Sequence, residues 1–355
     1  MFAQIAEQDC SEELLGEVRT ALNSKQPLRI RGGDSKSFLG RSTLGKEIDT
    51  RRHRGIVSYD PTELVVTVRA GTTLQELEII LDAAGQMLPS EAPVLGGETT
   101  IGGMVASGLS GPRRAYSGSV RDYVLGCRLI TGSAKHLRFG GEVMKNVAGY
   151  DVSRLLCGSF GAFGLLTEVS LKVLPRPRSV LSVGLEATSE AALSMLAKWR
   201  SEGIPISGAC HIDDVLHLRI EGGSGSVKAA RELVGGDEVS TSFWQELREF
   251  DLPFFKDERP LWRLSMPAAA PHIELPGRCV TDWGGTQRWL KSEADPLAIR
   301  ELAQRHGGHA TCYTPDVTDD PFHKLSAPLF QLHQRLKRQL DPSNIFNAGR
   351  MYPEI

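Results

Sequence analysis

A glycine-rich run at residues 95–108, LGGETTIGGMVASG, constrains this chain more than any other segment. Its small side chains leave the backbone bare, and glycine costs conformational entropy, so such runs persist where N–H groups must approach a ligand closely. A second run, RGGDSKSFLG at residues 31–40, follows a short strand predicted at 28–30. Two separated loops able to bind anions predict one large phosphorylated cofactor, and we expect the glycine-rich run to contribute little to the core.

Composition narrows the class of protein. A chain of 355 residues with 41% hydrophobic residues can bury a large core and suggests two domains. The net charge of −2 gives no general attraction to nucleic acid or to anionic lipid. The acidic N-terminus does not resemble a secretory signal, and no stretch reaches the ~20 apolar residues of a membrane span. We therefore expect a cytoplasmic protein that reaches the inner face of the plasma membrane, if at all, through partners.

The six cysteines are scattered, without the close spacing that binds zinc or iron–sulfur clusters. We predict free thiols and no metal site in this chain. An iron–sulfur cluster that exchanged electrons with it would belong to another subunit.

Two prolines in the segment LPRPRS, Pro175 and Pro177, predict an extended link between domains. Before the link, hydrophobic periodicity and Gly turns indicate an α+β domain with mixed sheets. Thr73 and Glu76 predict a capping box at the start of a helix that Gly85 can close. The predicted elements are a strand at 64–68, a helix at 73–84, a hairpin of 123–131 with 136–139, and a strand at 165–173.

After the link, the pattern predicts a βαββα unit that resembles the start of a ferredoxin-like fold. Its elements are a strand at 180–186, a helix at 190–200, a hairpin of 206–211 with 215–221, and a helix from 226. A less regular stretch follows, with strands at 261–265, 278–282 and 310–313 and helices at 296–306 and 322–340.

Neither glycine-rich loop matches the common nucleotide-binding motifs. The chain lacks the G-x-x-x-x-G-K-[ST] pattern of a P-loop. It also lacks a G-x-G-x-x-G turn between a strand and a helix with a later acidic residue, so a Rossmann fold is disfavoured.

An ordered set of segments resembles the flavoprotein family of vanillyl-alcohol oxidase and p-cresol methylhydroxylase (PCMH). The segments are RGGDSKSFLG, VRAGTTLQEL, TIGGMVASG, GSVRDYVLGCRLITG, GGEVMKNVAGYDVSRLLCGSFGAFGLLTEVSLKVLP and DPSNIFNAGRM. The resemblance covers residues 28–175 and the C-terminal tail. It implies an α+β fold in which a PCMH-type FAD-binding domain with two subdomains spans 1–176. A ferredoxin-like α+β C-terminal domain of the FAD-linked oxidase type would follow at 177–335, and a tail at 336–355 would return to the FAD domain.

The resemblance also implies which residues hold FAD. In this family the first loop and the TIGG segment surround the diphosphate, the AGTT turn adds to the site, and the GAFGLLTE strand borders the adenine. The residues carried over are Arg31, Gly32, Gly33, Asp34, Ser35, Lys36, Ser37, Gly71, Thr72, Thr99, Thr100, Ile101, Gly102, Gly103, Ala106, Ser107, Gly108, Gly164, Leu166 and Asn347.

Two departures in the first loop bear on how FAD is held. Family members with a covalently attached flavin often have a histidine there, and this loop has none, so FAD should be noncovalent. Asp34 stands where glycine is common, and aspartate tolerates a positive φ better than most residues. Its carboxylate would repel a diphosphate unless Lys36 or Arg31 offsets the charge.

Five segments resemble a narrower group within the family: RAYSGSVRDYVLGCRLITG, EVMKNVAGYDVSRLL, LWRLSMP, DWGGTQRWL and GGHATCY. This group consists of small FAD-binding subunits of three-part bacterial enzymes that oxidise glycolate. The resemblance implies a larger flavin subunit and an iron–sulfur subunit as partners. The implied reaction is oxidation of glycolate or another short 2-hydroxy acid to the 2-oxo acid, with the redox step carried out by the flavin. The alternatives are a noncatalytic FAD-bearing or assembly subunit, and a stand-alone flavin oxidoreductase.

The substrate site is less defined. A 2-hydroxy acid needs a cation for its carboxylate and a base for its hydroxyl proton. Arg263 and Arg288, each beside a tryptophan, are the candidates for binding the carboxylate, and a surface salt bridge or packing of the stem is the alternative role for each. Relatives that oxidise D-2-hydroxy acids carry a G-H-x-G-D-G-N-x-H metal motif. The segment CHIDDVLHL at 210–218 matches this motif only in part.

Overall fold

A computed structural model describes residues 7–141 and 151–355. The stretch EVMKNVAGY at 142–150, part of one family segment, lies outside the described residues. Contacts divide the chain into two compact units. The first contains 1–109, 119–175 and 324–355, and the second contains 110–118 and 176–323.

This division differs from the predicted boundaries at two places. Residues 110–118 belong to the second unit, where the buried Arg113 side chain pairs with Glu221 and Trp283 Nε1 donates to the Gly111 carbonyl at 2.9 Å. The return to the first unit begins at 324 rather than 336, because Phe330, near the start of the last helix, packs against the main hydrophobic core of that unit. Both differences arise from contacts between residues that are distant in the sequence.

The first unit is built on an antiparallel five-stranded sheet with the order β3-β4-β8-β6-β7. Its strands are β3 (Ile56–Asp60), β4 (Val65–Arg69), β8 (Leu165–Lys172), β6 (Val124–Ile130) and β7 (His136–Gly140). The predicted hairpin is confirmed by the pairing of β6 with β7. Two smaller sheets pair β1 (Leu28–Arg31) with β2 (Lys46–Asp49) in parallel and β5 (Gln86–Met87) with β9 (Leu174–Pro175) antiparallel.

Helix α2 (Leu74–Ala83) begins as the sequence predicts. The Thr73 hydroxyl accepts from the Glu76 N–H at 3.2 Å, and the Glu76 carboxylate accepts from the Thr73 N–H at 2.9 Å, which completes the capping box. The shorter helices of this unit are α5 (Val120–Tyr123) and α6 (Val152–Leu155).

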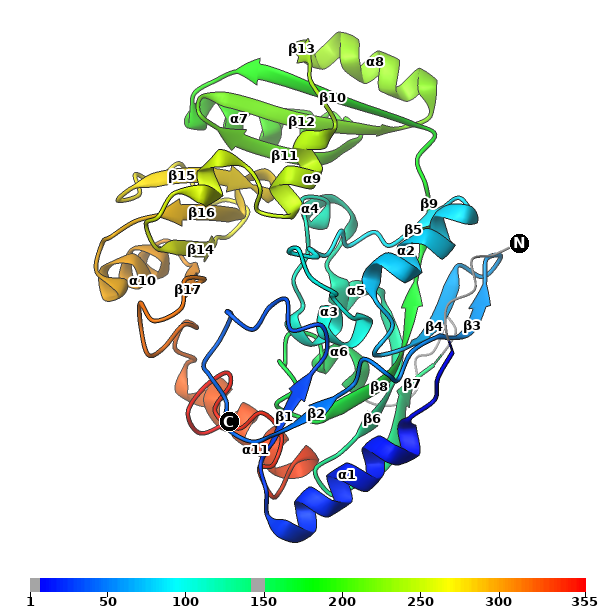
Figure 1. Ribbon diagram of the computed structural model, residues 1–355. Helices are drawn as coiled ribbons and strands as arrows, with labels where there is room; N and C mark the ends of the chain where they lie inside the picture. The colour runs from blue at the N-terminus through cyan, green and yellow to red at the C-terminus, as the bar shows by residue number, and fades with distance from the viewer. Residues whose placement is uncertain (1–6, 142–150) are drawn as a thin grey trace. The chain divides into compact units, whose positions relative to one another are not determined.

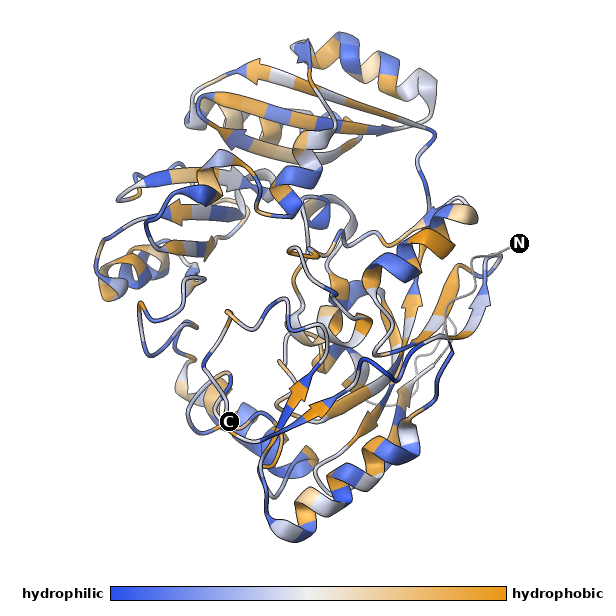
Figure 2. Cartoon of the chain, in the orientation of Figure 1, coloured by the Kyte–Doolittle hydropathy of each residue, from blue (hydrophilic) through white to orange (hydrophobic). Residues whose placement is uncertain are grey.

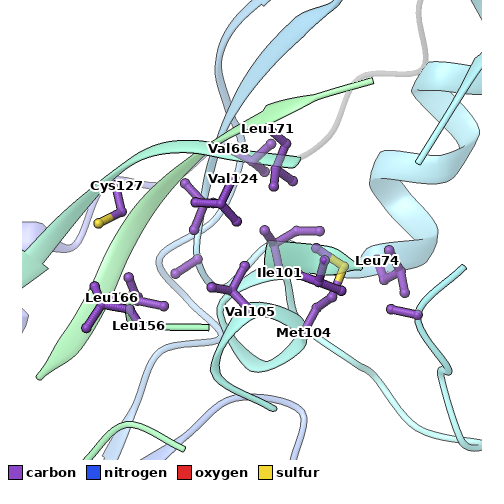
Figure 3. Close-up of a cluster of buried hydrophobic side chains, with 14 of the residues drawn as sticks. Val68, Leu74, Ile101, Met104, Val105, Val124, Cys127, Leu156, Leu166 and Leu171 are labelled. Atoms are coloured by element: carbon purple, nitrogen blue, oxygen red, sulfur yellow. The ribbon is translucent and has the colours of Figure 1, made fainter. Parts of the chain in front are cut away.

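The glycine-rich run is only partly the bare loop that we expected. Residues Ile101–Ser107 form helix α3, which Thr100 caps by accepting the Gly103 N–H at 3.1 Å. Ile101, Met104 and Val105 are buried in the main core of the unit, and Figure 3 shows them among side chains of the sheet and α2. The apolar residues at helical spacing favour a packed helix despite its two internal glycines. The run therefore packs side chains into the core and also leaves part of its backbone accessible.

The ends of the chain close the first unit. Helix α1 (Ser11–Ser24) has hydrophobic and hydrophilic bands (Figure 2) and packs Leu14, Val18 and Ala21 into a core shared with the C-terminal Phe346. Helix α11 (Ala327–Leu340) starts later than predicted, because Pro328 occupies the first turn, where its missing N–H costs nothing.

The second unit holds an antiparallel eight-stranded sheet with the order β13-β10-β12-β11-β15-β16-β14-β17 (Figure 1). In chain order its strands are β10 (Ser179–Glu186), β11 (Ile206–Ile212), β12 (Val215–Gly222), β13 (Asp237–Glu238), β14 (Leu261–Ser265), β15 (Arg278–Asp282), β16 (Gln287–Lys291) and β17 (His309–Cys312). Its helices are α4 (Arg114–Ser117), α7 (Ser189–Ser201), α8 (Ser224–Val234), α9 (Ser242–Arg248) and α10 (Pro296–Arg305), with 3-10 turns η1 (Pro253–Lys256) and η2 (Trp283–Gly285).

This sheet consists of two repeats of one strand order. From one edge of the sheet, the first four strands lie in the order β13-β10-β12-β11, which is fourth, first, third and second along the chain. From the opposite edge, the last four strands lie in the order β17-β14-β16-β15, which is the same pattern. The first repeat has a helix after its first strand (α7) and after its third (α8), which confirms the ferredoxin-like start. The second repeat keeps only α10, because residues 266–277 connect β14 to β15 without a helix.

Within the described ranges, no helix combines the length and the apolar character that crossing a membrane requires.

Candidate functional site

One open cavity in the first unit, with about 950 Å³ of space between atoms, gathers most of the residues expected to bind FAD. It lies where the loop after β1, the start of α3, the loop before β8 and the C-terminal tail meet. The expected residues that line it are Gly32, Gly33, Asp34, Ser35, Lys36, Ser37, Thr99, Thr100, Gly102, Gly103, Ala106, Ser107, Gly164, Leu166 and Asn347.

Close backbone packing sets the shape of this cavity. A Cβ on Gly33 would overlap the Glu98 carbonyl, so the first loop and the glycine-rich run can lie this close only with glycine there. The added Cβ of Gly103 would instead meet only Thr100 Oγ1, at 3.2 Å. Gly33 therefore joins the two loops, whereas Gly103 leaves backbone open toward the cavity.

Five residues expected at the cofactor lie outside the cavity lining and support it instead. Gly71 packs against the Thr50 and His53 carbonyls, and the Thr72 hydroxyl accepts the Gly55 N–H at 2.9 Å. Ile101 is fully buried, and Gly108 ends α3 with a φ of 64°. Arg31 pairs with Glu47 at 2.8 Å. Three backbone hydrogen bonds join residues 70–74 to residues 99–102, which explains why the two motifs occur together.

Asp34 adopts the left-handed conformation that we expected, with a φ of 57°. Its carboxylate pairs directly with Arg29, whose Nη2 lies 2.6 Å from Oδ2, and the nearby charge of Arg31 also offsets it, as the sequence suggested. Lys36 instead donates to Ser35 Oγ at 3.0 Å and to Thr99 Oγ1 at 2.7 Å.

The charges of the cavity fit an anionic cofactor. Arg29, Lys36 and Arg350 line it together with a single acidic residue, Asp34, which leaves a net positive charge of two. Burial lowers the pKa of Arg350, and the nearby Asp34 partly offsets that effect. Because cations and exposed N–H groups together bind diphosphates, the residues present fit FAD.

Sequence reasoning missed ten lining residues: Arg29, Ile30, Thr43, Thr50, Ala70, Leu156, Ser159, Phe160, Gly161 and Arg350. Some carried a signal. Arg29 and Ile30 immediately precede the first loop, and Arg350 follows Asn347 in the tail motif. Ala70 begins the AGTT turn and Gly161 begins the GAFGLLTE segment, both of which the resemblance assigns to the site. The position of the remaining residues at the cavity depends on the tertiary fold.

Asn347 joins the tail to the cavity. Its side-chain Oδ1 accepts the Ile30 N–H at 2.8 Å, and its Nδ2 donates to the Phe160 carbonyl at 2.6 Å. Lys337 positions the same tail by donating to the Phe346 carbonyl at 2.8 Å. Both ends of the Asn347 amide are thus engaged with backbone.

The two arginines expected to bind a substrate carboxylate lie on opposite faces of the eight-stranded sheet. Arg263 pairs across the strands with Trp289, whereas its neighbour Leu264 pairs with Arg288. Directly paired residues share a face and successive residues alternate, so the two guanidinium groups point away from each other. They cannot serve one substrate site.

Their surroundings also differ. Arg263 Nη1 donates to Tyr313 Oη at 3.1 Å, and its guanidinium lies 5.2 Å from the centre of the Trp283 ring. On the same face, burial and the charge of Arg263 lower the pKa of His309. Arg288 is 2% exposed and donates through Nη2 to the Pro271 carbonyl at 2.6 Å.

Comparisons with known proteins agree with this geometry. Residues 3–140 match the family described as FAD binding domain. The fold is similar to that of alkyldihydroxyacetonephosphate synthase, with a TM-score of 0.69 and 18% identity over 95% of this chain and 75% of that one. The fold and the cavity define a flavoprotein with a PCMH-type FAD-binding domain.

Sequence similarity over the full length shows to which family within this class of flavoproteins the chain belongs. The chain is 57% identical to glycolate oxidase subunit GlcE of Escherichia coli (strain K12) over 99% of this chain and 100% of the relative. It therefore belongs to the family of that subunit. D-lactate dehydrogenase of Anaerostipes hadrus is 30% identical over 50% of this chain and 38% of its own length.

Proposed function

We propose that this protein is the FAD-bearing subunit of an enzyme complex that oxidises glycolate or another short 2-hydroxy acid. The observation that carries the proposal is the net positive, glycine-walled cavity of the first unit. The substrate class is supported by the full-length similarity to a glycolate oxidase subunit.

The first loop and the start of α3 would hold the diphosphate of FAD noncovalently, with Lys36, Arg29 and Arg350 supplying positive charge. Gly164 and Leu166 would border the adenine, and Asn347 would hold the tail against the flavin end. When bound, FAD supplies the hydride acceptor for the hydroxy acid.

Arg263 is the residue that we propose for binding the substrate carboxylate. Its Nε is buried without a hydrogen-bond partner, and its Nη1 is positioned by Tyr313. A guanidinium positioned in this way can orient a carboxylate through charge-assisted bonds. His309 shares its face, and its lowered pKa keeps it neutral, as a base must be to accept the hydroxyl proton.

A larger flavin subunit and an iron–sulfur subunit complete the proposed complex. A cytoplasmic location, with membrane contact only through these partners, belongs to the same proposal. Fractionation of cells with and without the partner subunits tests the location.

A second candidate is a noncatalytic subunit that carries FAD for its larger partner. The sheet register favours this candidate, because it places Arg263 and Arg288 on opposite faces, so that one substrate site cannot use both. In this case the chain binds FAD but does not transfer electrons from glycolate to it.

Flavin spectra of the purified chain separate the candidates. Anaerobic glycolate should bleach bound flavin if the chain is catalytic, and R263M should prevent bleaching while retaining FAD. Retained FAD without bleaching, with bleaching restored by the larger partner, would support the noncatalytic subunit. Absence of bound flavin from the wild-type chain would overturn both.

A further inference from the structure

A cavity in the second unit lies where the second repeat lacks a helix. Residues 266–277 connect β14 to β15 at the place where α7 connects the corresponding strands of the first repeat. The lining combines Ser189 and Leu193 of α7 with residues of this connection and of β15 and β16. The space between atoms is about 740 Å³, part of it open to solvent.

Arg288 is the only basic side chain other than His272 that lines this cavity among the described residues. The side chain is almost fully buried, and its Nε has no hydrogen-bond partner in the described structure. Its Nη2 contacts are carbonyl oxygens, 2.6 Å from Pro271 and 3.5 Å from Ala270. No carboxylate of the described chain pairs with it, so its charge is left uncompensated, which is costly for a buried ion.

Other features of the cavity favour a small anion. Thr281 lies directly opposite Arg288 in the β15–β16 pair and therefore on the same face. Helix α7 begins at Ser189, so its partially positive end lies beside the cavity. An anion would thus meet the Arg288 guanidinium, the Thr281 hydroxyl and a helix terminus, whereas the Ser189 hydroxyl is already bonded to His211 Nδ1 at 3.1 Å.

The remaining walls select the kind of anion. Leu193, Ile273 and Leu275 are apolar, and the exposed acidic side chain of Glu274 disfavours ligands with several negative charges. A ligand with one carboxylate and a short apolar end satisfies both parts of the lining.

We propose that the Arg288 cavity binds a small monocarboxylate. The carboxylate accepts N–H bonds from Arg288, and the apolar end of the ligand lies against Leu193 and Leu275. This site belongs to the second unit alone and does not depend on FAD or on turnover of glycolate.

Propionate is a suitable probe because it has no hydroxyl group for a flavin to oxidise. Its binding to the full-length chain with FAD bound can be followed by saturation-transfer NMR. We expect saturable binding to the wild-type chain and an affinity reduced roughly tenfold or more in R288M, as expected for losing a charged hydrogen bond. R278M removes an exposed arginine on β15 and should bind propionate as the wild type does.

A second variant keeps the test valid if R288M does not fold. T281V retains the shape of the cavity but removes a hydroxyl group, so propionate should bind severalfold more weakly with an unchanged circular dichroism spectrum. Absence of propionate binding to the wild type, or equal binding by R288M and R278M, would overturn the proposal. Flavin content is measured in each sample, so failure to bind FAD is seen separately.

Discussion

The two units each contain a nearly fully buried cation, and their surroundings differ. Lys337 in the first unit donates to two carbonyls and to the Asp341 carboxylate at 2.7–2.9 Å. Among the described residues, Arg288 in the second unit donates only to carbonyls, and its Nε has no hydrogen-bond partner. A buried cation with a complete set of hydrogen-bond partners has a structural role, whereas one with an incomplete set beside a cavity indicates a ligand-binding site.

Replacing Lys337 with methionine tests the structural role and should have the largest effect. The substitution leaves the buried Asp341 carboxylate without its cation, so we expect a loss of about 3–5 kcal/mol in the free energy of unfolding. Urea denaturation measures the loss. The exposed neighbour Arg338 gives the matched control, and R338M should stay within about 0.5 kcal/mol of wild type. A loss below about 1 kcal/mol in K337M would contradict the structural role.

Gly33 and Gly103 allow the same comparison, between a structural role and a ligand-binding role, for backbone positions. G33A should lower both stability and FAD retention, because its Cβ would overlap the Glu98 carbonyl. G103V should weaken FAD binding by roughly 100-fold while the FAD-free protein keeps its stability to within about 1 kcal/mol, because its Cβ faces only Thr100 and the cavity. Flavin content after gel filtration and denaturation of the FAD-free proteins separate the two effects. Full FAD retention by G103V would contradict the placement of the diphosphate.

His53 provides a test that depends on pH, because it also has a complete set of partners. Its Nδ1 accepts the Cys10 N–H at 3.0 Å and its Nε2 lies 3.0 Å from the Thr167 carbonyl, so the fold needs the neutral ring. Burial lowers the pKa of His53 below its usual value of 6.5. The unfolded chain therefore takes up the proton first as pH falls, and the stabilisation present above about pH 6.5 decreases below it.

We expect the wild type to lose about 1 kcal/mol more stability than H53Q between pH 7.5 and 5.5. Urea midpoints at the two pH values measure this difference. Equal losses in the two proteins would assign the pH dependence to other groups.

The first unit was more predictable from sequence than the second for a physical reason. Its cavity depends on backbone geometry, and glycines, the Thr73 capping box and the Asp34 turn are local signals of that geometry. Arg29 as the partner of Asp34 was missed because side-chain pairing depends on the fold.

The missed strand β16 shows why the second unit was harder. Its sequence, QRWLK, is buried throughout, although it carries Arg288 and Lys291. Polar residues on both faces remove the period-two hydrophobic pattern that marks a strand. Without β16, neither the second repeat nor the opposite orientation of Arg263 and Arg288 could be seen.

Arg288 should show the smallest effect on stability. We expect R288M to unfold within about 1 kcal/mol of wild type in buffer free of carboxylates, because removing an unpaired buried charge offsets the lost bonds. The Pro271 carbonyl that it releases belongs to an exposed residue and can bond to water. Excess propionate should then stabilise the wild type and R278M but not R288M, because a ligand that binds only the folded state raises the free energy of unfolding. A loss of 3–5 kcal/mol in R288M without propionate would make Arg288 structural, like Lys337, and would remove the difference between the two buried cations.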